Sequence, residues 1–168
     1  LNIIDYNRVV FDLNGHSEDE ILSQLADSFD CEVLDVSNPE DAKPRSQREF
    51  GMYLGSRWYR LSIKPDLVPS NDPVRELDVS LLQDHILEPL FGIQDPRTDK
   101  RIDFVGGIRG LKELERRCSV DSKVAFALYP TSITQLINIA DAGEVMPPKS
   151  TWFEPKLRSG VVVRTFQS

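Results

Sequence analysis

The stretch FGMYLGSRWYRLSI, residues 50–63, decides the fold. Two runs rich in aromatic and aliphatic residues flank the pair Gly55-Ser56, which is typical of a two-residue hairpin turn in which glycine can adopt a positive φ. Polar and apolar residues alternate along the second run, so one face of the hairpin is expected to pack inward. We interpret Trp58 and Tyr59 as residues that pack on the sheet rather than as a ligand platform. All strands before residue 64 are therefore expected to pair antiparallel.

Helices are predicted on either side of this hairpin. Residues 16–29 carry a capping box, in which Ser17 is the N-cap and Glu20 stands three residues later. Residues 77–93 predict a helix capped by Asp78 or Ser80, which Pro89 should end or kink. Residues 130–143 predict a helix capped by Thr131 or Ser132. Its apolar face is expected to consist of Ile133, Leu136, Ile137 and Ala140.

The second half of the chain alternates between strands and helices. A strand at 101–105, a glycine-rich loop at 106–110, a helix at 111–118 and a strand at 123–129 predict a βαβ-type unit. The β-branched run GVVVRTF, residues 160–166, is expected to be a closing strand. The predicted fold class is therefore α+β, with an N-terminal antiparallel hairpin region, a C-terminal βαβ-type unit, a mixed sheet and helices packed on that sheet.

The length of the chain fits one domain. Residues 1–168 can bury a hydrophobic core, and the polar, proline-bearing loop at 64–76 is the best internal boundary. The chain opens at Leu1 with a β-type pattern and no preceding turn. We therefore expect it to be the C-terminal fragment of a longer protein, with the N-terminal part of its own polypeptide as a partner.

Composition and charge exclude several classes of protein. The net charge is −7, so sequence-independent binding of nucleic acid by the whole surface is not expected. No apolar run is long enough to span a membrane. The cysteines, Cys31 and Cys118, lack CxxC spacing, which favours a reduced, cytoplasmic setting with both thiols buried or idle. With two histidines and no cysteine cluster, no metal site is expected.

Positive charge gathers at the C-terminal end. The last 20 residues carry a net charge of +3 and the remaining 148 carry −10. A basic segment on an acidic body can form an anion site, or it can dock on its own acidic body. Both readings stay open from the sequence.

A first candidate anion site is the loop between the strand at 101–105 and the following helix. Backbone N–H groups at a helix N-terminus can bind phosphate, and nearby basic side chains would add charge. The candidate residues are Gly106, Gly107, Arg109, Gly110 and Lys112. The pattern is neither GxGxxG nor a Walker loop, and two glycines at such a turn can equally serve the backbone geometry.

A second candidate is the segment EVMPPKSTWFEPKLRSG, residues 144–160. Its prolines favour a stiff, extended backbone just before Lys149, Ser150 and Thr151, whose side chains suit an anion. Lys156 and Arg158 follow close by and would add charge. A nucleotide or a phosphorylated metabolite is the expected ligand class. Alternatively, the prolines run along a sheet edge and the basic residues pair with the acidic body.

Four long motifs carry a resemblance to a known family. They are DYNRVVFDLNG (5–15), MYLGSRWYRLSIKP (52–65), LDVSLLQDHILEPLFGIQDPRTDKRIDFVGGIRGLKELERR (77–117) and IADAGEVMPPKSTWFEPKLRSG (139–160). With these the chain resembles the C-terminal part of the bacterial "domain of unknown function 1015" family. The family has an upstream motif that is similar to one in the ParB-like superfamily, whose members include chromosome-partitioning proteins and a free-serine kinase. That motif is absent from this chain, so the resemblance assigns no nucleotide-binding or DNA-binding residue here.

Three functions remain open from the sequence. In the first, the chain completes a phosphate or nucleotide site of a ParB-like small-molecule enzyme, whose catalytic residues lie outside this chain. In the second, the chain is a non-catalytic scaffold or dimerisation module, which acts as a homodimer. DNA binding in a partitioning role ranks third because the chain is acidic.

Overall fold

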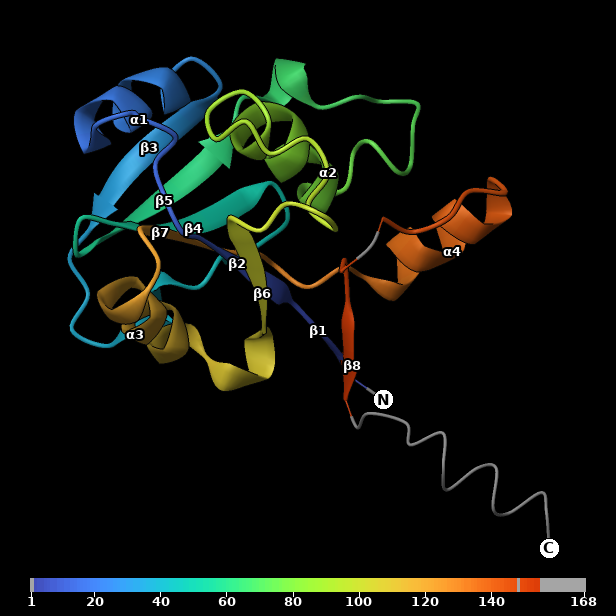
Figure 1. The fold of residues 1–168 in the computed structure, drawn as a ribbon. Helices are drawn as coiled ribbons and strands as arrows, with labels where there is room; N and C mark the ends of the chain where they lie inside the picture. Colours follow the sequence, from blue (N-terminus) through green and yellow to red (C-terminus); the bar gives the residue numbers. More distant parts are fainter. Residues whose placement is uncertain (1, 148, 155–168) are drawn as a thin grey trace, which may run out of the picture.

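A computed structural model describes residues 2–147 and 149–154 (Figure 1). Six strands form one sheet in the order β3-β5-β4-β7-β2-β6, and every neighbouring pair runs antiparallel. A separate two-stranded ribbon pairs β1 with β8. The strands are β1 (Asn2–Ile4), β2 (Tyr6–Val10), β3 (Phe29–Leu34), β4 (Glu49–Leu54), β5 (Arg57–Ile63), β6 (Ile102–Gly106), β7 (Val124–Ala127) and β8 (Trp152–Glu154).

Helices pack on the sheet, so the predicted α+β class is confirmed. The α-helices are α1 (Glu18–Leu25), α2 (Asp78–Leu82), α3 (Leu111–Val120) and α4 (Ile133–Asp141). A π-helical turn η3 (Gln83–Leu87) continues α2, and the helix ends before Pro89, as predicted. Three short 3-10 turns are η1 (Pro39–Ala42), η2 (Pro65–Leu67) and η4 (Gly107–Arg109).

The hairpin β4–β5 forms as the sequence predicts. Gly55 and Ser56 have φ values of 58° and 63°, and such a pair of positive angles matches the twist of the flanking strands. The expectation that one face of the hairpin packs inward was too narrow, because both faces are buried. Tyr59 and Leu61 pack in one core cluster, while Trp58 packs in a second cluster on the other face.

Two of the three predicted helix caps are confirmed. Ser17 and Ser132 each accept a hydrogen bond from the third helical residue, which bonds back to complete a capping box. The predicted cap of α2 was wrong, because Leu77 takes the N-cap position without a side-chain bond. Asp78 instead accepts from the Arg48 backbone N–H at 2.9 Å, and the Ser80 hydroxyl donates to the Val74 carbonyl.

The predicted βαβ-type unit is present in a split form. β6 and β7 flank β2 on opposite sides and both run antiparallel to it, so β6 and β7 are parallel and α3 connects them. The expected mixed sheet was wrong for neighbouring strands, because β2 is inserted between the two parallel ones. This insertion places β2, near the start of the chain, inside the C-terminal half of the fold.

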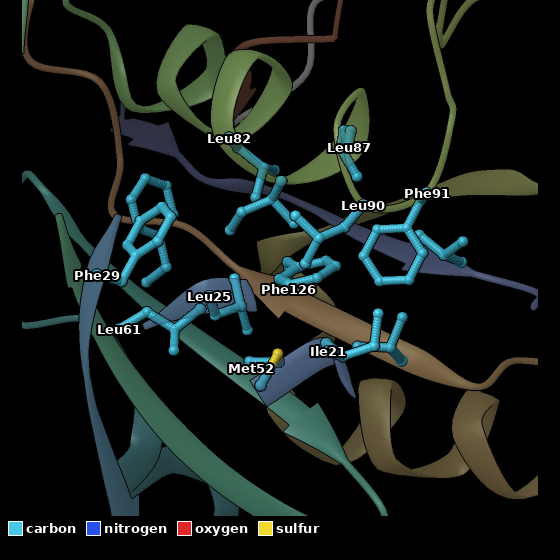
Figure 2. Close-up of a cluster of buried hydrophobic side chains, with 14 of the residues drawn as sticks. Ile21, Leu25, Phe29, Met52, Leu61, Leu82, Leu87, Leu90, Phe91 and Phe126 are labelled. Carbon is cyan, nitrogen blue, oxygen red and sulfur yellow. The ribbon is translucent and has the colours of Figure 1, made fainter. Parts of the chain in front are cut away.

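The sheet separates two hydrophobic clusters. On one face α1 and α2–η3 contribute Ile21, Leu25 and Leu82 to a large cluster with Met52, Leu61 and Phe126 (Figure 2). On the other face Leu111 and Leu114 of α3 pack against small or β-branched residues, which are Val9, Ala125 and Ala127. Alternate residues of β2 and β7 therefore face opposite cores, as the period of a strand requires.

Two further predictions concern a C-terminal strand and membrane-spanning segments. The closing strand predicted at 160–166 lies outside the described residues. Among the residues that the structure describes, no helix is both long and apolar enough to cross a bilayer.

Candidate functional site

An arginine is buried on the inserted strand β2. Arg8 pairs in register with Phe104 on β6 and Phe126 on β7, and its side chain lies on the same face of the sheet as Val10. The residue is only 2% exposed. Arg8 therefore stands at the margin of the larger core, where the surrounding positions are apolar.

Backbone carbonyls, and not carboxylates, hold this guanidinium. Arg8 donates to the carbonyl of Tyr6, and its Nη2 donates to the carbonyl of Lys149 at 2.8 Å. Its Cζ atom lies 5.1 Å from the centroid of the Phe104 ring. Within residues 2–147 and 149–154, no carboxylate lies within ion-pair distance of Arg8. Burial lowers the pKa of Arg8 to about 10, so the side chain still carries its charge at neutral pH.

A second cation lies against the same aromatic ring. The Lys149 ammonium is 5.8 Å from the centroid of Phe104 and 5.5 Å from that of Tyr6, and the two rings meet edge to face. Lys149 has a φ of 58°, which is uncommon for a residue with a side chain and often accompanies functional sites. No ion pair of Lys149 is found in the described part of the chain. We call Arg8, Lys149, Tyr6 and Phe104 the Arg8–Lys149 site.

A cavity of about 550 Å³ adjoins this site. Its walls come from α2–η3, from the loop after that helix and from the C-terminal segment. They include Arg8, Arg75, Gln83, Leu87, Arg97 and Pro147. Arg75 pairs with Asp84 at 3.5 Å, and Arg97 bonds to both carboxylate oxygens of Asp95. Of the three arginines that line the cavity, Arg8 is thus the one whose charge has no carboxylate beside it.

The glycine-rich loop at 106–110 is already occupied by the chain's own carboxylates. Leu111, the first residue of α3, donates its N–H to Oε2 of Glu40 at 2.6 Å, which is the position that a bound phosphate would take. Gly107 donates its N–H to the Asp5 carbonyl, and a Cβ at Gly107 would lie 2.3 Å from Oδ1 of Asp5. An external anion would have to displace these groups.

The remaining predicted site residues fall into three places. Arg109 pairs with Glu113 at 3.5 Å and Lys112 is exposed, both beside the glycine-rich loop. Ser150 and Thr151 are half-buried next to Lys149, and the Ser150 hydroxyl donates to the Pro147 carbonyl. Lys156 and Arg158 lie outside the described residues. The structure thus separates the two predicted candidates and joins the second one to β2.

The cysteines supply no reactive group. Cys31 is exposed, and burial of part of its thiol raises its pKa. Burial raises the pKa of Cys118 to about 12. Neither thiol is therefore ionised to a useful extent near neutral pH. No group of three or more metal-ligating side chains occurs among the described residues.

The first part of the chain matches a known family model. Residues 1–80 match the family model described as "Protein of unknown function (DUF1015)". The resemblance indicated by the sequence motifs is confirmed over these residues. No curated protein matches the chain.

Solved structures give a weaker likeness. A mutant free serine kinase in complex with AMP has 13% sequence identity and a TM-score of 0.48, and the match covers 90% of this chain and 53% of that chain. A conserved hypothetical protein from Pyrococcus furiosus has 14% identity and a TM-score of 0.48, with coverage of 89% and 54%. The chain spans about half the length of the solved structures it matches. A likeness of this degree assigns no ligand to the present chain.

The segment that matches DUF1015 supplies only part of the candidate site. Arg8, Arg75 and the α2 wall up to Ser80 lie within residues 1–80, whereas Phe104 and Lys149 lie beyond them. The sequence prediction missed Arg8 altogether. A signal was present, since an arginine directly precedes the apolar pair Val9-Val10 in a run that otherwise predicts a buried strand.

Proposed function

We propose that this chain contributes an anion-binding site, formed by the Arg8–Lys149 site and the adjoining cavity, to a protein that binds a phosphorylated metabolite or a nucleotide. The observation that carries the proposal is the burial of the Arg8 charge without a carboxylate partner. In the chain alone this charge is destabilising. An anionic ligand would supply the missing counter-charge.

The physical argument rests on the cost of an isolated charge. Buried arginines are normally paired, and an unpaired buried ion costs several kcal/mol even after relaxation. The two carbonyls that accept from Arg8 satisfy part of its hydrogen bonding but supply no negative charge. A packed apolar side chain would serve stability at least as well at this place. The presence of an arginine at this buried place therefore supports a role in binding.

The composition of the site favours phosphate over a single carboxylate. Arg8 and Lys149 lie about the same Phe104 ring, so two positive charges converge without a negative one between them. A phosphate monoester carries close to two negative charges and three acceptor oxygens at neutral pH. The cavity of about 550 Å³ falls within the usual range for small-ligand pockets. We propose that catalytic groups come from residues outside this chain.

Isothermal titration and thermal unfolding of the 168-residue chain would test this function. The probes are inorganic phosphate, pyrophosphate, AMP and ADP, applied to the wild type and to Arg8→Met, Arg8→Lys and Lys149→Met. A ligand at 100 times its Kd should add about 2.7 kcal/mol to the free energy of unfolding. We expect a stabilised wild type and a loss of at least tenfold in affinity in Arg8→Met and Lys149→Met.

Arg116→Met is the matched control, because Arg116 is exposed and pairs with Glu113 on α3, across the sheet from the site. Its response also corrects for the general stabilisation of proteins by phosphate salts. The proposal is wrong if none of the four probes binds, or if Arg8→Met binds them as tightly as the control.

A further inference from the structure

Helix α4 carries an exposed apolar face. Seven large apolar side chains are exposed in the described part of the chain, and four of them lie between residues 129 and 145. These four are Tyr129 (37% exposed), Ile133 (63%), Ile137 (52%) and Val145 (82%). The other three are scattered singly, as is normal for a protein surface. The sequence predicted this apolar face, but the structure shows two of its isoleucines turned away from the body.

The attachment of α4 to the body is slight. In Figure 1, α4 lies at the right of the view, away from α1 and α3 at the left. Ile139 is its buried residue, and Gln135 accepts a 2.7 Å hydrogen bond from the Gln47 side chain. A helix of nine residues is marginal in water by itself, because most helical stability in proteins comes from packing of the apolar face. A cover for Ile133 and Ile137 is therefore expected.

We propose that α4 packs antiparallel against α4 of a second copy of this chain, about a two-fold axis beside Ile137. In one register of this helix pair, both the sizes of the facing side chains and their charges are complementary. Ile133 of one copy lies opposite Ala140 of the other, so that a large residue meets a small one. The same register places Asp141, near the C-terminal end, opposite Ser132 at the N-cap of the partner helix.

The charges of α4 favour this arrangement. Asp141 is the one charged residue in the helix, and its place in the last turn is unfavourable to the dipole of its own helix. Next to the N-terminus of an antiparallel partner, the same carboxylate becomes favourable. The facing stripe of Ile133, Ile137 and Ala140 carries no charge, so two copies of an acidic chain can approach there without direct repulsion.

The size of the contact sets the expected affinity. A nine-residue helix is about 14 Å long, and its face buries less than the roughly 800 Å² per partner of a standard stable interface. We therefore expect a weak dimer, with a Kd on the order of 10–1,000 µM.

Analytical ultracentrifugation over a wide concentration range is the first test. Ile137→Asp and Ile137→Lys should each be monomeric, because the axis brings the two copies of residue 137 together. An equimolar mixture of these two variants should associate again through opposite charges. Val33→Asp, at an exposed position on β3, should associate like the wild type. Because Ile137 is exposed, its substitution should leave the melting temperature of the monomer within about 2 °C of the wild type.

Exchanging the large and the small residue that face each other tests the register of the two helices. Ile133→Ala and Ala140→Ile should each weaken association at least threefold, and the double variant should recover the wild-type Kd. A chain that is monomeric at every concentration up to 1 mM overturns the proposal and leaves α4 to a different polypeptide. Association that Ile137→Asp leaves unchanged overturns it as well, because the contact then lies elsewhere. Neither result affects the Arg8–Lys149 site, which lies outside α4.

Discussion

The Lys149 carbonyl accepts a 2.8 Å hydrogen bond from Nη2 of Arg8, a residue 141 positions earlier in the chain. This bond connects the proline-containing segment around Lys149 with strand β2. It also joins a residue that sequence reasoning selected to one that it missed. The cation–π contacts of both side chains with Phe104 place two like charges around one ring. A hydrogen bond and two cation–π contacts thus hold two like charges near one another.

Arg8→Met should lower the free energy of unfolding by no more than about 3 kcal/mol. The fall of the Arg8 pKa from its ordinary value to about 10 corresponds to roughly 3 kcal/mol against the buried charge. Loss of this penalty offsets the cost of leaving the Tyr6 and Lys149 carbonyls without their donor, about 1–3 kcal/mol each. Urea denaturation would measure the change, with Leu82→Ala as a comparison expected to lose about 2–5 kcal/mol. A loss above 3 kcal/mol in Arg8→Met would indicate a structural arginine.

Asp78→Asn should stabilise the protein at pH 7.5 by about 1–2 kcal/mol. Burial is the largest influence on Asp78 and raises its pKa from 3.8 to about 6, although the Arg48 N–H and guanidinium oppose this shift. The folded state therefore binds the proton more tightly than the unfolded state does. Ionisation of Asp78 removes stability as the pH rises through 6, and the asparagine variant avoids this loss.

The pH dependence gives a sharper measurement of the same effect. The difference in unfolding free energy between Asp78→Asn and the wild type should be largest above pH 7 and should shrink as the pH falls from 6 to 4. Other carboxylates, such as Asp99, have lowered pKa values and lose stability in acid, but they contribute equally to both proteins and cancel. Asp95→Asn changes a partly exposed aspartate whose pKa is lowered by Arg97, and it should show the opposite trend. A pH-independent difference for Asp78→Asn would contradict the raised pKa.

Local signals in the sequence predicted local structure well. The capping boxes at Ser17 and Ser132 and the turn at Gly55-Ser56 depend on residues within four positions of one another, so their chemistry is readable from the chain. The predicted cap of α2 was wrong because a residue far away in the sequence determines the role of Asp78. Asp78 is engaged by Arg48, 30 residues earlier, and this tertiary contact overrides the local preference for a cap.

Long-range pairing was not readable in the same way. The sequence contains nothing local that places β2 between β6 and β7, and this insertion turns the expected βαβ unit into its split form. It also puts Arg8 beside Phe104 and within reach of Lys149. The glycine-rich loop likewise fits a phosphate cradle by its residues, while Glu40, about 70 positions earlier, supplies the carboxylate that binds the helix N-terminus. Candidate sites thus depended on contacts that only the fold supplies.

Glu40→Ala should destabilise the protein by about 1–2 kcal/mol. The Glu40 carboxylate accepts the Leu111 N–H at 2.6 Å and lies at the positive end of the α3 dipole, so its removal costs both a cap and a favourable charge. Glu40→Gln keeps an acceptor and should lose about half as much. Thermal unfolding would measure both variants, with Asp41→Ala, a neighbouring exposed acid in η1, as the control. Equal losses in Glu40→Ala and Asp41→Ala would exclude a specific cap.

Gly107→Ala tests the close packing of Asp5 on the glycine-rich loop. A Cβ at Gly107 would lie 2.3–2.6 Å from the three carboxyl atoms of Asp5, which is far inside van der Waals contact. Asp5 is half-buried, and burial raises its pKa, so its carboxyl group would have to move within a partly packed environment. We expect Gly107→Ala to lose about 1–3 kcal/mol of unfolding free energy.

The cause can be isolated with a double-mutant cycle. Asp5→Ala removes the atoms that the new methyl group would meet, so Gly107→Ala should cost at least 1 kcal/mol less in that background. Gly110→Ala serves as the control, because its φ of +77° makes the substitution strained whether or not Asp5 is present. Its cost should therefore be the same in both backgrounds. If the cost of Gly107→Ala were also unchanged by Asp5→Ala, the glycine would be needed for its backbone, and the packing of Asp5 on it would carry no energy.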